Sequence, residues 1–322
     1  MIRILANDGI DAAGKQMLTD AGFEVSTTKI PQEKLITGLN EGMFDAILVR
    51  SATKVTKQAL DGCPRLKLIG RAGVGMDNID VNYAVSKGIK VINTPDASSQ
   101  SVAELVFAHL YGMARFLHDS NRLMPQQGAV KFDELKKKYA NGRELKGKTL
   151  GIVGFGRIGQ AVAAIALGTG MKVLAYDPFI ASADIFLQID GHLGLSITIK
   201  TVEFKALLQN SDFITLHVPH SEGSMPLITA KDFNLMKTGV GIVNAARGGV
   251  ISEQDLLDAL NTGRVAFAGI DVFANEPHPL QALLNHPAVS LSPHIGASTI
   301  EAQERIGVEL AKKVIAFFAH NS

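Results

Sequence analysis

The chain has 322 residues, of which 46% are hydrophobic and 20% charged, with a formal net charge of +1 at pH 7. This length predicts about two domains of ~150 residues each, and so small a charge gives no electrostatic reason to expect nucleic acid or a membrane surface as partner. The single cysteine, Cys63, excludes an internal disulfide and suits a reducing compartment, so we expect a cytoplasmic protein. Residues 1–8 lack the apolar core of a signal peptide, and no uninterrupted apolar run reaches the ~18 residues of a membrane span.

The first 98 residues alternate short β-branched runs with helical patterns. Strict alternation of this kind predicts a parallel sheet covered by helices on both faces. No glycine fingerprint occurs in this part, so it is not expected to bind a dinucleotide. Strands are predicted at 2–6, 23–27, 46–49, 68–71 and 90–93, with helices at 11–21 and 82–87 among the connections.

A long helix is predicted after this first α/β half. Ser101 and Glu104 have the S-x-x-E spacing of a capping box, and apolar residues then recur at helical spacing as far as Leu117. We interpret this segment as a helix that joins two domains. His109 and His118 lie on it and are interpreted as packing or surface residues rather than ligands.

Glycines follow the next predicted strand, 150–153, at the spacing of a dinucleotide-binding turn. Gly154, Gly156 and Gly159 form G-x-G-x-x-G, a helical pattern follows, and a second β-branched run ends at Asp177, near the ~20-residue offset of the fingerprint. The glycines allow a tight turn, close approach of a pyrophosphate and close helix packing, and the helix N-terminus offers N–H groups to phosphates. Asp177 can bind an adenosine ribose and would repel a 2′-phosphate, which favours NAD over NADP. The strand before the glycines, the helix after them, the second strand and Asp177 all fit this fingerprint. A glycine-rich turn that binds no ligand is therefore the less favoured interpretation.

The pattern after this fingerprint predicts that a second α/β unit continues to about residue 294. Residues 181–200 are interpreted as an irregular insertion, because Gly191 and Gly194 would break a helix. Ser298 and Glu301 form another capping box, which predicts a helix from there to about residue 319. The further strands are expected at 213–216, 241–244, 265–271 and 289–291.

Side chains of three different chemical types follow the last three of these strands. They are Arg247, Glu276 and His294. Because open α/β sheets bind ligands at the carboxyl ends of their strands, these three side chains can converge beside a nicotinamide. Hydride transfer at a 2-hydroxy acid needs a group that takes or returns the hydroxyl proton, which histidine does near neutral pH. A carboxylate would orient the imidazolium and an arginine fork would hold the substrate carboxylate.

Each of these residues also has a structural interpretation. Arg247 could be a salt-bridge residue, Glu276 a turn acid before Pro277, and His294 a loop residue after Pro293. Taken singly, Glu276 is better explained by a structural role, whereas for Arg247 and His294 the sequence leaves both a structural and a functional role open. Their shared position after three strands favours a function.

Together these stretches resemble the D-isomer-specific 2-hydroxyacid dehydrogenase family. The resemblance covers nearly the whole chain. It is carried by VRSATK at 49–54, GRAGVGMDNID at 70–80, the glycine loop with YDP at 176–178, NAARGG at 244–249, DVFANEP at 271–277 and PHIGAST at 293–299.

The resemblance implies roles for particular residues and requires no metal. Arg247, Glu276 and His294 would be catalytic, with His294 as the acid/base. The implied NAD-binding residues are Gly154, Gly156, Arg157, Ile158, Gly159, Asp177, Val218, Ala245, Ala246, Asp271, Gly296 and Ala297. The implied substrate-binding residues are Arg50, Ser51, Gly73 and Val74.

The resemblance also implies an α/β architecture of two doubly wound parallel-sheet domains. A Rossmann NAD-binding domain, 99–295, would be inserted into a discontinuous flavodoxin-like catalytic domain formed by 1–98 and 296–322. The helix region 99–117 would mediate homodimer formation. The C-terminal regulatory domain of some relatives is not expected after residue 322.

Within the family, the chain most resembles members that oxidise 3-phosphoglycerate to 3-phosphohydroxypyruvate, at the entry to serine synthesis. A phosphate needs further cations, and Arg50, with Lys54 and Arg71, lies at the ends of two predicted strands of the first half, 46–49 and 68–71. An enzyme acting on glyoxylate, hydroxypyruvate or lactate is the alternative with the same mechanism. An NAD-sensing protein related to transcriptional corepressors is the alternative of another class. The sequence alone leaves the hydroxy acid, the physiological direction and the oligomer open.

Overall fold

A computed structural model of the chain describes residues 1–187, 194–221 and 223–320. Its internal contacts divide it into two compact units, Met1–Ser99 with Ala297–Ser322, and Gln100–Gly296. The predicted domain boundaries differ from these by one residue. None of the described helices is both long and apolar enough to cross a membrane.

The first unit contains a parallel five-stranded sheet in the order β2-β1-β3-β4-β5. This is the flavodoxin-like order, which confirms the doubly wound fold. Every residue of its central strand β3 is buried, as expected of a sheet with helices on both faces. The strands are β1 Arg3–Ala6, β2 Glu24–Ser26, β3 Ala46–Val49, β4 Leu68–Arg71 and β5 Lys90–Asn93.

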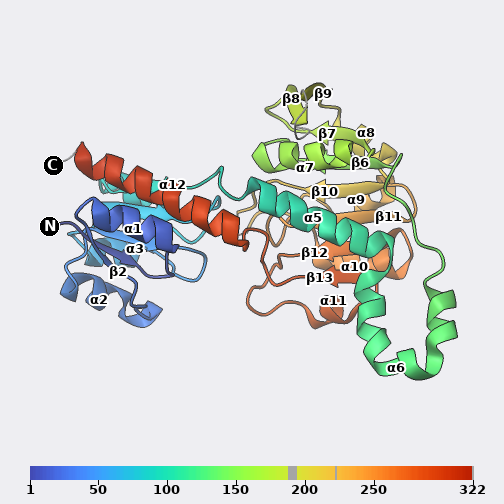
Figure 1. Ribbon diagram of the computed structural model, residues 1–322, viewed down its shortest axis with the longest axis horizontal. Helices are drawn as coiled ribbons and strands as arrows, with labels where there is room; N and C mark the ends of the chain where they lie inside the picture. The colour runs from blue at the N-terminus through green and yellow to red at the C-terminus, as the bar shows by residue number, and fades with distance from the viewer. Residues whose placement is uncertain (188–193, 222, 321–322) are drawn as a thin grey trace. The chain divides into compact units, whose positions relative to one another are not determined.

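Helices cover both faces of this sheet (Figure 1). One face packs against α1 and α12, which approach so closely that a Cβ on Gly14 would lie 2.5 Å from the backbone of Gly307. The other face packs against α2, α3 and α4. The helical elements are α1 Ala12–Asp20, η1 Gln32–Lys34, α2 Leu35–Glu41, α3 Lys57–Gly62, α4 Val81–Ser86 and α12 Ile300–Ala319.

The second unit contains a parallel six-stranded sheet in the order β13-β12-β11-β10-β6-β7. Strand β6 pairs with β7 on one side and β10 on the other, so the strand order reverses beside the end of β6. In open α/β sheets such a switch point is where ligands bind. The strands are β6 Thr149–Val153, β7 Lys172–Tyr176, β10 Phe213–Leu216, β11 Val240–Asn244, β12 Val265–Ile270 and β13 Val289–Leu291.

One face of this sheet packs against α5 and α7, and the other against α8 to α11 (Figure 1). α6 continues the chain beyond α5. The helices are α5 Ser99–Ala114, α6 Leu117–Lys138, α7 Arg157–Gly168, α8 Phe204–Asn210, α9 Ala230–Leu235, α10 Glu253–Asn261 and α11 Gln281–Asn285.

Two predicted helix starts are wrong. Helix α5 begins at Ser99, so Ser101 is a buried residue within its first turn rather than its cap. Helix α12 is capped by Thr299, whose side chain accepts a hydrogen bond from the N–H of Ala302, and not by Ser298. The predicted joining helix also divides at Phe116, whose left-handed backbone (φ 56°) separates α5 from α6.

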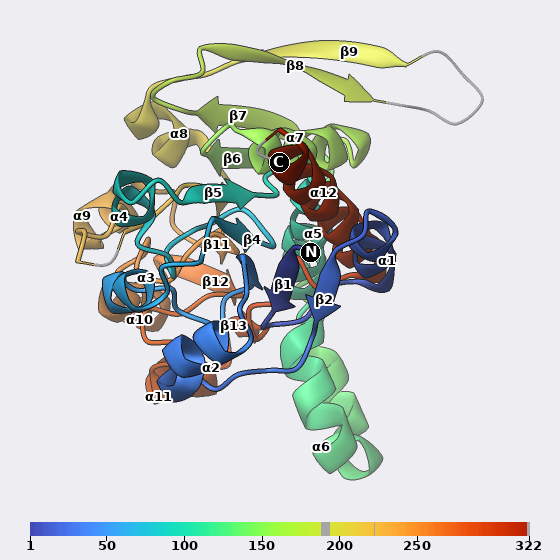
Figure 2. The same ribbon diagram turned by 90° about the vertical axis from the view of Figure 1, so that its left-hand side faces the viewer.

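The predicted irregular insertion is instead an antiparallel hairpin of β8 Ser182–Leu187 and β9 Leu195–Lys200 (Figure 2). Alternate residues of the two strands point to one face, and Ile185 and Ile199 are buried there in the core beside α7. Gly191, taken as a helix breaker, lies outside the described residues. A period of two in the apolar residues was the signal that the sequence interpretation missed.

Candidate active site

Arg247, Glu276 and His294 lie after three neighbouring parallel strands, β11, β12 and β13. The carboxyl ends of these strands lie at one edge of the sheet, so the structure brings the three side chains together. The closest contact joins His294 Nδ1 to Glu276 Oε2 at 2.8 Å. A carboxylate only accepts hydrogen bonds, so Nδ1 carries the proton of this bond and Nε2 is left to face a reactant.

Glu276 is held in its ionised form. Burial alone would raise the pKa of its carboxyl, but the hydrogen bonds from His294 and from the N–H of Phe273, with the nearby charge of Arg247, hold that pKa below its ordinary value. Its carboxylate therefore stays charged at neutral pH and accepts the hydrogen bond from His294 Nδ1.

The loop that carries Arg247 is held by the side chain of Asn244, which bonds the backbone of the loop. Asn244 at the end of β11 donates from its amide to the Arg247 carbonyl at 2.9 Å and accepts from the N–H of Ala246 at 3.1 Å. A Cβ at Gly248 would overlap the Phe273 carbonyl, so glycine lets this loop approach the loop of Glu276. The Arg247 guanidinium itself donates to the Ala246 carbonyl at 2.6 Å.

The backbone of His294 is strained and is held by one residue. Its φ of 56° is left-handed, which is costly for a residue other than glycine. Three successive N–H groups bond to Asp271: His294 N–H to its carbonyl at 2.8 Å, Ile295 N–H to Oδ1 at 2.9 Å and Gly296 N–H to Oδ2 at 3.0 Å. Asp271 is 1% exposed, and its described bonds all lie within this unit. A contact with NAD would use the acceptor capacity that these bonds leave.

The glycine loop at the switch point fits a pyrophosphate. A Cβ at Gly154 or Gly159 would overlap a backbone carbonyl, whereas a Cβ at Gly156 would meet nothing within 4 Å, so open space lies over the middle glycine. Among the described residues no side chain caps α7 at Gly156, which leaves the first-turn N–H groups, including those of Arg157 and Ile158, for an anion.

Asp177 is positioned beside this loop. Its Oδ2 accepts from the N–H of Phe155 at 2.8 Å, and its Oδ1 accepts from Phe179 and Ile180. A carboxylate has about four acceptor positions, so one is left for a ribose hydroxyl. The other predicted cofactor residues follow strands of the same sheet: Val218 after β10, Ala245 and Ala246 after β11, and Gly296 after β13. Ala297 begins the returning segment of the first unit.

We expect Asp177→Asn to weaken NAD by about tenfold and to improve NADP relative to it. The substitution keeps an oxygen for the Phe155 N–H and removes the charge, which is worth about that factor in a charged hydrogen bond. Steady-state kinetics with both cofactors measure this. Asp184→Asn on the hairpin should change neither value, and equal use of NAD and NADP by the unmodified protein would contradict the assignment.

His217 lies next to the glycine loop and was not singled out from the sequence. Its carbonyl packs against Gly154, and its Nε2 lies 3.0 Å from the Thr215 hydroxyl. Burial lowers the pKa of His217 to about 3, so this imidazole is neutral and does not serve as a second acid. Its Nδ1 is buried without a hydrogen-bond partner among the described residues. Its position directly before Val218 was the available signal.

The predicted substrate residues gather at the carboxyl edge of the other sheet. Arg50 and Ser51 follow β3, and Gly73 and Val74 follow the neighbouring strand β4. Gly73 has a φ of 138° and donates to the Thr94 hydroxyl at 2.8 Å. The described residues contain no cluster of three His, Cys, Asp or Glu side chains that could hold a metal.

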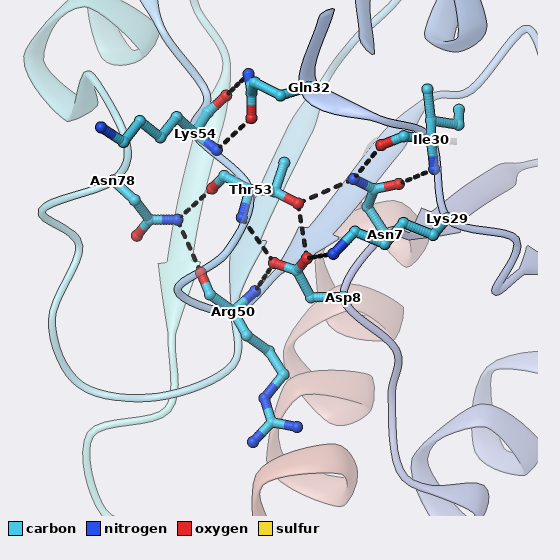
Figure 3. Close-up of polar contacts among 9 residues, drawn as sticks. All are labelled: Asn7, Asp8, Lys29, Ile30, Gln32, Arg50, Thr53, Lys54 and Asn78. Carbon is cyan, nitrogen blue, oxygen red and sulfur yellow. Dashed lines mark hydrogen bonds and ion pairs between the residues drawn. The ribbon is translucent and has the colours of Figure 1, made fainter. Parts of the chain in front are cut away.

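The loop of Arg50 is held from two sides (Figure 3). The Asp8 carboxylate accepts from the N–H groups of Arg50 at 2.8 Å and Thr53 at 3.1 Å, and Asn78 donates to the carbonyls of the same two residues. The Arg50 guanidinium extends away from these bonds and lines a cavity of about 260 Å³ with Gln303. Within the described chain this guanidinium makes no hydrogen bond or ion pair.

We expect Glu276→Gln to move the pH range of rapid reduction to lower pH. In its predicted role His294 is the proton donor of reduction, and the neutral amide of glutamine does not stabilise a positive charge beside it. The kcat of reduction measured against pH shows the shift. Glu253→Gln is a matched control, because Glu253 also holds this loop, through the N–H of Ala274 at 2.8 Å. An unchanged profile for Glu276→Gln would count against the pairing.

Comparison with known proteins identifies relatives of this architecture. Residues 107–296 match the family model described as D-isomer specific 2-hydroxyacid dehydrogenase, NAD binding domain. The chain is 42% identical to a hydroxypyruvate reductase of Thermotoga maritima over 97% of both chains. It is 39% identical to a D-3-phosphoglycerate dehydrogenase of Methanocaldococcus jannaschii over 98% of this chain but 57% of that protein.

The solved structure of a glyoxylate reductase from Paecilomyes thermophila has the same fold. It superposes with a TM-score of 0.80 at 29% identity and covers 97% of this chain and 94% of that one. The chain thus spans nearly the full length of two reductases and little more than half of the phosphoglycerate dehydrogenase.

Proposed function

The chain belongs to the D-isomer specific 2-hydroxyacid dehydrogenase family and uses NAD, and we propose that it interconverts hydroxypyruvate and D-glycerate. The observation that carries the reaction type is the bond between His294 and Glu276 at 2.8 Å beside Arg247. NAD, when bound, supplies or accepts the hydride.

The chain's own residues would handle the proton and the carboxylate. The Arg247 guanidinium offers two parallel donors to a substrate carboxylate and a positive charge near the 2-oxo group. His294, oriented by its hydrogen bond to Glu276, gives a proton from Nε2 to the carbonyl oxygen in reduction and takes it back from the hydroxyl in oxidation. The N–H groups of the glycine loop and of the first turn of α7 would hold the cofactor phosphates.

The cations of the first unit favour an unphosphorylated acid. Of the three residues considered for a phosphate, Arg50 lines the cavity, and Arg71 donates to the carbonyl of Ala72 at 2.8 Å. Lys54 is not among the residues that line the cavity, and its side chain runs in a different direction from that of Arg50 (Figure 3). One arginine is a modest site for a doubly charged phosphate. The full-length similarity to a hydroxypyruvate reductase agrees with this choice. Because the Arg50 guanidinium in this cavity could bind one phosphate group, 3-phosphohydroxypyruvate is the second candidate substrate.

A panel of 2-oxo acids tests the proposal. Hydroxypyruvate, 3-phosphohydroxypyruvate, glyoxylate and pyruvate are each supplied with NADH, and cofactor oxidation is followed by absorbance. We expect the highest kcat/KM with hydroxypyruvate. A highest value with the phosphorylated acid would replace the proposal by the second candidate. Tight NADH binding without turnover of any acid would favour an NAD-sensing protein.

We expect Arg50→Gln to raise the KM for 3-phosphohydroxypyruvate about tenfold, because one charge-assisted hydrogen bond is lost. The KM for hydroxypyruvate should stay within about twofold of its original value. Lys54→Gln is the control and should change neither value. An equal loss with both acids would show that Arg50 binds the carboxylate they share.

A further inference from the structure

A buried chain of hydrogen bonds runs from α5 to the loop of His294. His109 on α5 is 4% exposed and lies between two serines, with Nδ1 2.9 Å from the Ser290 hydroxyl and Nε2 3.0 Å from the Ser292 hydroxyl. The Ser292 hydroxyl lies 2.6 Å from Asp271 Oδ1. The reaction described above makes no use of His109.

The direction of every bond in this chain follows from its chemistry. The Asp271 carboxylate can only accept hydrogen bonds, so the Ser292 hydroxyl donates its single proton to it. His109 must then donate from Nε2 to the Ser292 oxygen. Burial lowers the pKa of His109, although the charge of Asp271 opposes this, so the ring is neutral and its Nδ1 accepts from Ser290. Every hydrogen bond in this network is therefore donated in the same direction, from Ser290 toward the Asp271 carboxylate.

The far end of the chain is the residue that holds the strained loop. Both carboxylate oxygens of Asp271 bond the N–H groups that follow His294, and its carbonyl bonds that of His294 itself. The Ser292 hydroxyl fixes the orientation of this carboxylate, because Oδ1 accepts hydrogen bonds from both that hydroxyl and the N–H of Ile295. Rotation of the carboxylate would loosen a backbone whose φ of 56° is unfavourable.

The neighbouring strand leaves room for the imidazole. A Cβ at Gly269 of β12 would lie 2.8 Å from the Cβ of His109. Glycine at position 269 therefore leaves the space that the His109 side chain occupies. The ring is therefore seated between α5 and the ends of two strands, with a hydrogen bond at each nitrogen.

We propose that His109 is a positioning residue for His294, acting through Ser292 and Asp271 on the backbone of residues 294–296. The inference rests on the proposed function in taking His294 as the acid/base. Because Arg247 holds the substrate carboxylate, loss of His109 should lower kcat more than it changes KM.

The test compares four variants of the whole protein, with NADH bound in the hydrogen-exchange experiment. His109→Leu removes both ring nitrogens, Ser292→Ala breaks the same link at its other end, and the double variant combines them. His109→Gln keeps a donor toward Ser292. His118→Leu is the matched control, since within the described chain the hydrogen bonds of this histidine are to backbone carbonyls. The readouts are hydrogen exchange at the N–H groups of Ile295 and Gly296, kcat, KM and the NADH dissociation constant.

We expect His109→Leu and Ser292→Ala each to speed exchange and to lower kcat by about tenfold, the effect of one hydrogen bond. KM and NADH binding should stay within about twofold. The double variant should lose no more than the worse single variant, as members of one network do, and His109→Gln should recover most of the loss. The control should match the unmodified protein.

Unchanged exchange and kcat in His109→Leu, or additive losses in the double variant, would overturn the proposal. If His109→Leu fails to fold, Ser292→Ala and His109→Gln test the same link. An unmodified protein that reduces no 2-oxo acid would refute the proposed function, while the exchange measurement would still decide whether His109 holds the loop.

Discussion

His294→Ala should lose about 10²–10⁴-fold of kcat, the usual contribution of a positioned proton donor. In the proposed reaction the imidazole supplies the proton that the substrate oxygen takes up, and its Nδ1 bond to Glu276 at 2.8 Å orients the ring for that purpose. NADH binding should persist, because the glycine loop and Asp177 follow β6 and β7, which are four and five strands away from β13 in the sheet order. Steady-state turnover and NADH fluorescence measure the two effects.

His278→Ala is the matched control for this prediction. His278 is an exposed histidine in the loop that carries Glu276, and its removal should leave turnover unchanged. A His294→Ala protein that keeps a tenth or more of kcat would contradict the role of His294 as acid/base.

Arg247→Gln should lower kcat/KM by roughly 10²–10⁴-fold, because two charge-assisted hydrogen bonds of about 1.5–3 kcal/mol each are lost. Arg247→Lys keeps the positive charge but lacks the planar guanidinium, so its kcat/KM should lie between those of the unmodified protein and Arg247→Gln. The substrate dependence of NADH oxidation measures both variants.

NADH binding serves as the control for Arg247→Gln and should be unaffected. Arg264→Gln offers a matched substitution, since Arg264 donates to Thr238 at 2.9 Å on another loop. A loss smaller than about tenfold in Arg247→Gln would show that another group holds the substrate carboxylate.

The strands and the three strand-end residues could be predicted because they depend on short-range patterns. β-branched runs gave β3, β4, β5, β10 and β13 with their observed bounds. The parallel order then places Arg247, Glu276 and His294 at one edge. The topological argument needs no knowledge of side-chain orientation, so it holds for the residues that directly follow the strands.

What could not be predicted depends on choices between equivalent residues or on distant contacts. Ser298 and Thr299 are both good helix caps, and only the backbone geometry selects Thr299. His109 reaches Ser290 and Ser292 across about half the chain, and no local period signals that pairing. Arg71 ends β4 as expected, yet its guanidinium donates to the carbonyl of the next residue, Ala72.

The stereochemistry of glycerate oxidation tests the central claim most directly. The unmodified protein is supplied with NAD and either D-glycerate or L-glycerate, and NADH formation is followed by absorbance. We expect NADH from D-glycerate alone, with His294→Ala inactive under the same conditions. NADH formation from L-glycerate, or from neither enantiomer while hydroxypyruvate is also left unreduced, would contradict this account.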